Sequence, residues 1–128
     1  MKKFTKILAL TLVLMMSVAL FASCAAPNKD PEKAKEALEK AEYEVIYADA
    51  ELAEVAAAML GIEKVTALIS ASKGDDAIEI FYFEDAAAAN DAFDAVKEMA
   101  EEAGTTAEVK KSGNMIYYGT PAAIKAAK

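Results

Sequence analysis

The sequence lacks several residue types on which common catalytic and binding sites depend. It has no histidine, no tryptophan and no arginine, and its only cysteine is Cys24. Without histidine, a Ser-His-Asp triad, a Cys-His pair and an imidazole base are all excluded within this chain. A single cysteine provides neither an intrachain disulfide nor a thiolate metal cluster. Without arginine, only the point charges of lysine remain for binding phosphate or carboxylate groups.

Glycine is also scarce, and positive charge is outweighed by negative charge. The five glycines are dispersed at expected element boundaries, so no glycine-rich phosphate loop is indicated. The chain has 21 acidic residues against 14 lysines. This balance repels nucleic-acid phosphates and anionic lipid headgroups, which argues against a nucleic-acid partner and against a polybasic membrane surface.

The first 24 residues have the pattern of a secretory signal. Lys2, Lys3 and Lys6 give a positive start, and the run from Ile7 to Phe21 is apolar or small apart from one threonine and one serine. This run is short for a bilayer span, which needs ~20 residues. The signal ends at Cys24, and a charged start followed by a short apolar run and small residues predicts cleavage.

The string Phe21-Ala22-Ser23-Cys24 resembles the lipobox of bacterial lipoproteins. Ala22 and Ser23 match the small residues of that motif and Cys24 matches the acylated residue, whereas Phe21 replaces the usual Leu, Val or Ile. The resemblance implies that residues 1–23 are removed. It also implies that acylated Cys24 holds the protein to the lipid bilayer, on the extracytoplasmic face of the cell membrane. A plain signal peptide and an uncleaved anchor are the alternatives.

The rest of the chain is predicted to form one domain. Residues 24–30 read as a lipidated tether, and residues 31–128 as a single α+β domain, because about 105 residues suffice for one core. With three of the 14 lysines removed, the mature chain has a formal net charge of −10. Attachment to a membrane would therefore depend on lipid rather than on charge.

Capping residues and hydrophobic periodicity predict four helices and five strands. The helices begin after Asp30, Asp49, Asp85 and Thr120 and extend to about residues 42, 60, 103 and 128. In the second helix Leu52, Val55, Ala56 and Met59 recur at helical spacing. The expected strands are 43–48, 62–72, 77–83, 105–111 and 114–118, with the clearest hairpin turn at 73–76.

From residue 44 the expected order is strand, helix, strand, strand, helix, strand. This βαββαβ pattern predicts a ferredoxin-like antiparallel sheet with an extra C-terminal strand and added N- and C-terminal helices. Right-handed crossovers would place the two inner helices on one face of the sheet. The other face then needs a cover of its own.

The strand at 77–83 is apolar on both sides, which leaves two interpretations. Phe81 and Phe83 lie on one side beside Glu79, and three further apolar residues lie on the other. In the first interpretation one of these sets packs under a terminal helix as ordinary core. In the second, Phe81 and Phe83 form an exposed aromatic patch that docks a protein, peptide or small apolar ligand. The tyrosines that could join this patch are Tyr43, Tyr47, Tyr117 and Tyr118.

The sequence thus predicts a membrane-anchored extracytoplasmic lipoprotein that acts as a non-enzymatic binding or interaction module without a cofactor. Its partner would be an envelope protein or a small ligand. The alternative is a solute- or metal-binding lipoprotein with a small carboxylate/tyrosine site, although the acidic residues fit no EF-hand spacing. An enzyme would need a pocket that holds at least one acid with a strongly shifted pKa.

Overall fold

The computed structural model describes residues 26–105 and 107–128. The elements in these residues are α2 (Pro31–Lys40), β1 (Glu44–Ala48), α3 (Ala50–Met59), β2 (Val65–Lys73), β3 (Asp76–Phe83), α4 (Ala86–Glu102), β4 (Lys110–Ser112), β5 (Met115–Gly119) and α5 (Pro121–Ala126). The expected elements are present in the described residues. Of the strand predicted over 105–111, residue 106 lies outside the described residues, and only Lys110 and Lys111 belong to a strand, the short β4.

Each helix begins where the sequence predicts, because the predicted capping side chain accepts a hydrogen bond from a backbone N–H of the first turn. The donor–acceptor distances are 3.0, 3.2, 2.8 and 3.4 Å at Asp30, Asp49, Asp85 and Thr120, respectively. The hairpin between β2 and β3 is also confirmed. Gly74 at its turn has φ +57°, a left-handed conformation that favours glycine.

The α+β class is confirmed, whereas the ferredoxin-like strand order is not. The described strands form one antiparallel sheet in the order β1-β2-β3-β5-β4. A split βαβ unit needs another strand between the two strands that its helix joins. Here α3 joins β1 and β2, which are direct antiparallel neighbours, with Ile46 opposite Ser70. The chain leaving β1 therefore returns at the same end of the sheet.

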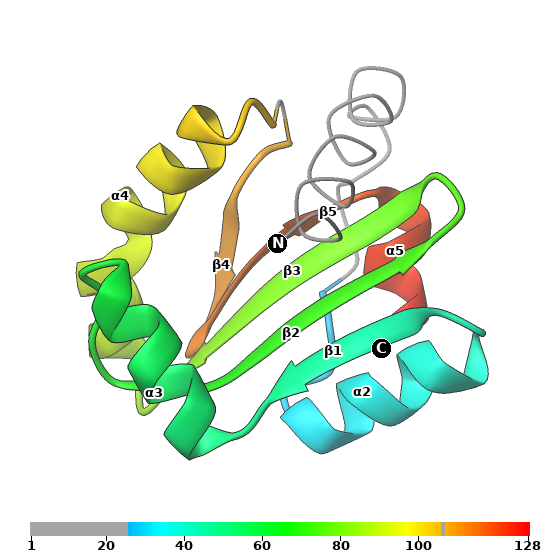
Figure 1. Cartoon of the computed structure of the whole chain (residues 1–128), viewed down its shortest axis with the longest axis horizontal. Coiled ribbons are helices and arrows are strands. Elements are labelled where there is room, and N and C mark those ends of the chain that lie inside the picture. Colours follow the sequence, from blue (N-terminus) through cyan, green and yellow to red (C-terminus); the bar gives the residue numbers. More distant parts are fainter. Residues whose placement is uncertain (1–25, 106) are drawn as a thin grey trace.

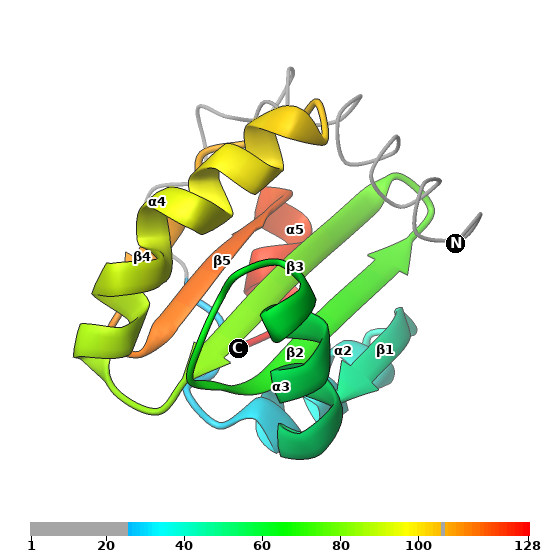
Figure 2. The ribbon, with the colours of Figure 1, turned by 60° about the vertical axis from the view of Figure 1, so that its left-hand side comes forward.

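Helices cover both faces of the sheet and create two cores (Figure 1). α3 and α4 lie together on one face, as expected for the two inner helices (Figure 2). They cover the first core, which includes Phe81, Phe83 and Val96. α2 and α5 cover the opposite core, which includes Leu38 and Ile124. The two terminal helices thus supply the second cover that the sequence requires.

Gly119 in β5 tests how closely this sheet is packed. An added Cβ would lie 2.6 Å from the carbonyl oxygen of Ala77 and 2.8 Å from Cα of Ile78. Because backbone atoms cannot swing aside, we expect Gly119→Ala to lower the free energy of unfolding by about 1–3 kcal/mol, measured by urea denaturation. Gly113→Asn is the control, since Gly113 has open space and a left-handed φ that asparagine tolerates. Equal losses in both variants would contradict the contact.

Candidate functional site

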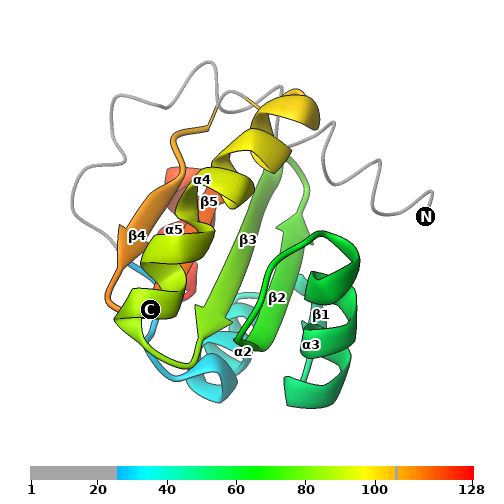
Figure 3. The same cartoon turned by 90° about the vertical axis from the view of Figure 1, so that its left-hand side faces the viewer.

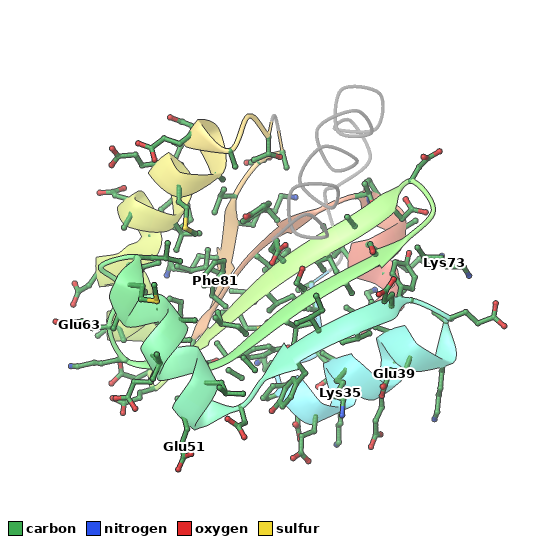
Figure 4. The ribbon with its side chains drawn as sticks, viewed as in Figure 1. Lys35, Glu39, Glu51, Glu63, Lys73 and Phe81 are labelled. Atoms are coloured by element: carbon green, nitrogen blue, oxygen red, sulfur yellow. The ribbon has the colours of Figure 1, made fainter. Side chains whose placement is uncertain are left out.

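The four aromatic residues considered as a partner surface are all buried. Phe81 and Phe83 are 5% and 1% exposed, and they pack with Tyr118 in the core beneath α3 and α4. Figure 4 shows Phe81 between the sheet and these helices. Tyr117 packs in the opposite core beneath α2 and α5. The four side chains therefore form no exposed patch, because helices on both faces of the sheet exclude them from solvent.

The lipidation site, Cys24, lies outside the described residues, but the segment that follows it is partly described. Ala26 packs against the core beneath α2 and α5, and Pro27 is buried. The backbone N–H of Asn28 donates to the carbonyl of Ala127 at 2.8 Å, and the hydroxyl of Tyr82 donates to the carbonyl of Asn28 at 2.7 Å. Residues 26–28 are therefore part of the folded unit rather than a free tether, since both backbone and side-chain bonds hold them.

Within the described residues, most of the exposed large apolar side chains lie on α3 or at its end, and sequence periodicity did not predict that they would face outward. Ala53 and Ala57 are fully buried and face the sheet. Four larger apolar side chains on α3 or at its C-cap are 52% to 84% exposed. We call this set the α3 patch: Leu52, Val55, Met59 and Leu60. Small alanines bring α3 close to the sheet, and the larger side chains are then left in solvent.

One more exposed apolar side chain lies on the edge strand β1, on the face of the sheet that α3 covers. α3 lies on the β1 side of the sheet, away from β4 (Figure 3). Ile46 of β1 shares the α3 side with Ala48 and is 50% exposed. Five large apolar side chains exposed on neighbouring elements exceed the scattered single residues that are normal for a soluble surface. This region is the strongest candidate for an interaction site.

Glu79 is a buried acid for which the sequence pattern predicts no role. It is 9% exposed in the middle of β3, and its Oε1 accepts a hydrogen bond of 2.8 Å from Oγ of Ser70. Burial raises the pKa of Glu79 to about 7, although the Ser70 hydrogen bond opposes the shift. Tyr118 lies opposite Glu79 on β5. Burial, with a smaller contribution from the Glu79 charge, raises the pKa of the Tyr118 hydroxyl.

A small pocket lies between the loop after α3 and the start of α4. It has a volume of about 180 Å³. It is lined by Gly61, Ile62, Glu63, Lys64, Ala88, Asp91, Ala92 and Ala95. This volume is below the ~300–1,000 Å³ of typical small-molecule sites. Glu79, the acid with the shifted pKa, does not line this pocket. Among residues 26–105 and 107–128, no group of three or more Asp, Glu, His or Cys is arranged to hold a metal ion.

Two tyrosines on the α2 side contact lysines instead of joining an aromatic patch. Nζ of Lys35 lies 5.4 Å from the centroid of the Tyr47 ring, and Nζ of Lys73 lies 5.8 Å from that of Tyr43. Both distances suit cation–π attraction. Burial, with a smaller contribution from Glu32, raises the pKa of the Tyr47 hydroxyl. The Lys35–Tyr47 pair thus adds a contact between α2 and β1, while Ala34 and Leu38 bury the inner face of α2 in the core.

Two sequence signals could have indicated the residues that were missed. In a strand with one face in solvent, polar and apolar residues normally alternate. The run from Ile78 to Phe83 has a single glutamate and is otherwise apolar, which indicates that both faces are covered and that the acid is buried. A helix with apolar residues on two sides, as in α3, indicates a second contact beyond the sheet.

No helix in the described part of the chain is both long and apolar enough to cross a lipid bilayer. Comparison of the chain with protein-family models, with curated proteins and with solved structures finds no match.

Proposed function

We propose that the protein is a lipid-anchored, extracytoplasmic and non-enzymatic interaction module. The anchor is supported by the sequence, in which a charged start, a short apolar run and two small residues precede Cys24. The interaction role is supported by one structural observation, the exposure of the α3 patch and of Ile46 on the same face of the sheet. A surface of this kind on a soluble domain is typical of a contact with a partner.

The start of the described chain suits an anchor at Cys24. Only Ala25 separates Cys24 from Ala26, which already packs against the core beneath α2 and α5. Two Cα–Cα steps of ~3.8 Å join residues 24 and 26. An acylated Cys24 would therefore hold the α2 and α5 side of the domain close to the bilayer.

The distribution of charge supports the same orientation. α3 and α4 together carry seven acidic residues and one lysine, whereas α2 and α5 carry four lysines and three acidic residues. If the bilayer surface is anionic, it repels the first pair of helices and attracts the second. The domain would thus turn its acidic helices away from the membrane surface and leave the α3 patch accessible at the side.

The anchor is tested by mass spectrometry of the mature protein from the membrane fraction of cells that make the full chain. We expect residue 24 to be the N-terminus and to carry a diacyl or triacyl adduct, because the motif requires a thiol at that position. Cys24→Ser should abolish the adduct and release the protein from the membrane. Ala25→Ser, a change of similar size next to it, should keep both. A chain that retains Met1 and a free thiol at Cys24 would refute the anchor.

A further inference from the structure

We propose that the first partner of this module is a second copy of the chain, paired through the open edge of β1 with the apolar side of α3 next to the contact. The inference deepens the proposed function in that it takes the α3 side as an interaction surface. It does not depend on the lipid. Two features carry it: the backbone edge of β1 and the charges on α2.

Among residues 26–105 and 107–128, no strand pairs with the outer edge of β1, so the backbone groups on that side are open. Ladder hydrogen bonds alternate along an antiparallel strand. The N–H of Thr120 donates to the carbonyl of Ala77, which assigns Ala77 to the β5 side of β3. Its neighbour Ile78 therefore bonds to Ala71 of β2. The next residue of β2, Ser70, then bonds to Ile46 of β1, so Val45 and Tyr47 direct their N–H and C=O groups to the open side.

The two edges of the described sheet differ in how well they are protected. β4 is three residues long and contains Lys110 and Lys111. Short length and lysines are the usual means of preventing strand pairing at an edge. β1 has five residues with neither lysine nor proline, and its register with β2 is regular from Glu44 to Ala48. β1 is therefore the edge that can accept another strand.

A two-fold axis beside Ile46 gives a self-consistent register. Antiparallel pairing about this axis bonds Val45 to Tyr47 of the second copy and Tyr47 to Val45 of the second copy. Ile46 then faces Ile46 of the second copy as a pair without mutual hydrogen bonds, at a Cα–Cα distance of ~4.5 Å. Two half-exposed isoleucines would bury each other on the α3 side. Such an interface is isologous, as in most dimers.

The charges on α2 match the same axis. Lys35 lies over Tyr47, and the N–H of Tyr43 donates to the carbonyl of Leu38 at 2.9 Å, so α2 runs antiparallel to β1. Glu39 then lies toward the start of β1, with Ile46 at a level between it and Lys35. Both side chains project from the same side of α2, past the β1 edge (Figure 4). The two-fold axis would bring each Lys35 opposite Glu39 of the second copy.

The location of residues 26–28 is compatible with this dimer. An axis perpendicular to the sheet keeps α2 and α5 of both copies on one side of the continuous sheet. Ala26 packs on that side. Both chains would therefore reach the same bilayer. Burial of the α3 patch in the membrane itself is less favourable, because Glu51, Glu54 and Glu63 lie on or beside α3 and their carboxylates would have to leave water.

A disulfide across the axis tests the register in membranes that contain the full chain. We expect Ile46→Cys to form a covalent dimer on mild oxidation with diamide, because ~4.5 Å between Cα atoms lies within the range of disulfides. The unmodified chain, with Cys24 as its only cysteine, and Ala87→Cys, at an exposed site on α4, should remain monomeric on a non-reducing gel. Dimer in equal amounts from all three, or adducts of Ile46→Cys with other proteins instead, would overturn the inference.

A charge exchange tests the same axis without covalent bonds. In detergent, sedimentation of the full chain should show that Lys35→Glu weakens association roughly tenfold, because it makes two pairs repulsive. Adding Glu39→Lys should restore association, which a merely structural role of Lys35 would not produce. No rescue would overturn the register. A monomeric chain that carries lipid at Cys24 would refute the dimer and support the anchor. A dimeric chain without lipid at Cys24 would support the dimer and refute the anchor.

Discussion

Phe83→Ala is expected to lower the free energy of unfolding by about 3–5 kcal/mol, the usual cost of removing a fully buried phenylalanine. Phe83 is 1% exposed and packs in the core beneath α3 and α4. Its ring is enclosed by the sheet on one side and by the helices on the other, so the cavity left by alanine has little scope to collapse. The measurement is urea denaturation followed by far-ultraviolet circular dichroism.

The same experiment separates the two interpretations of the aromatic strand. Met59→Ala is the matched control, because Met59 is 84% exposed in the α3 patch and its loss should change the free energy of unfolding by less than ~0.5 kcal/mol. A partner surface would give the opposite result. If Phe83→Ala left stability unchanged and Met59→Ala reduced it, the assignment of core and surface described above would be wrong.

Local structure follows closely from the sequence because its determinants are local. The side chains of Asp30, Asp49, Asp85 and Thr120 reach N–H groups only two or three residues away, so each helix start is determined by a few adjacent residues. The turn between β2 and β3 likewise depends on Gly74 and its neighbours. Such features need no knowledge of the rest of the chain.

Strand order does not follow in the same way. The pattern of strand, helix, strand predicts a crossover, yet the connection from β1 through α3 returns to the same end of the sheet and pairs β1 directly with β2. Both routes use the same kinds of elements, and the difference lies in packing between distant residues. Which side of α3 faces the sheet also depends on packing against residues distant in the sequence. The small Ala53 and Ala57 face the sheet, whereas the larger Leu52 and Met59 are exposed.

Glu79→Gln is expected to remove most of the pH dependence of stability between pH 5 and 8. The folded state holds the pKa of Glu79 at about 7, against an ordinary value of 4.5, chiefly because burial disfavours the charged carboxylate. Between these two values the folded chain binds more protons than the unfolded chain. The free energy of unfolding must therefore fall as pH rises, from its highest value below pH ~4.5 to its lowest value above pH ~7.

The size of this fall is about 3 kcal/mol, since a tenfold difference in proton affinity between the folded and unfolded chains corresponds to ~1.4 kcal/mol. The absence of histidine means that no imidazole titrates in the same range. Glutamine keeps the shape and can still accept the hydrogen bond from Ser70, but it has no charge to bury. At pH 8 Glu79→Gln should thus be more stable than the unmodified chain by about 2–3 kcal/mol, and at pH 5 nearly equal to it.

Urea denaturation of both chains at pH 5, 6, 7 and 8 measures this difference directly. Glu63→Gln, at an exposed residue that lines the small pocket, removes the same charge from the surface and should change the free energy of unfolding by less than ~0.5 kcal/mol. A slope that persists in Glu79→Gln would mean that Glu79 reaches water in the folded state. The carboxylate would then ionise at its ordinary pKa, and the central strand would contain no buried acid.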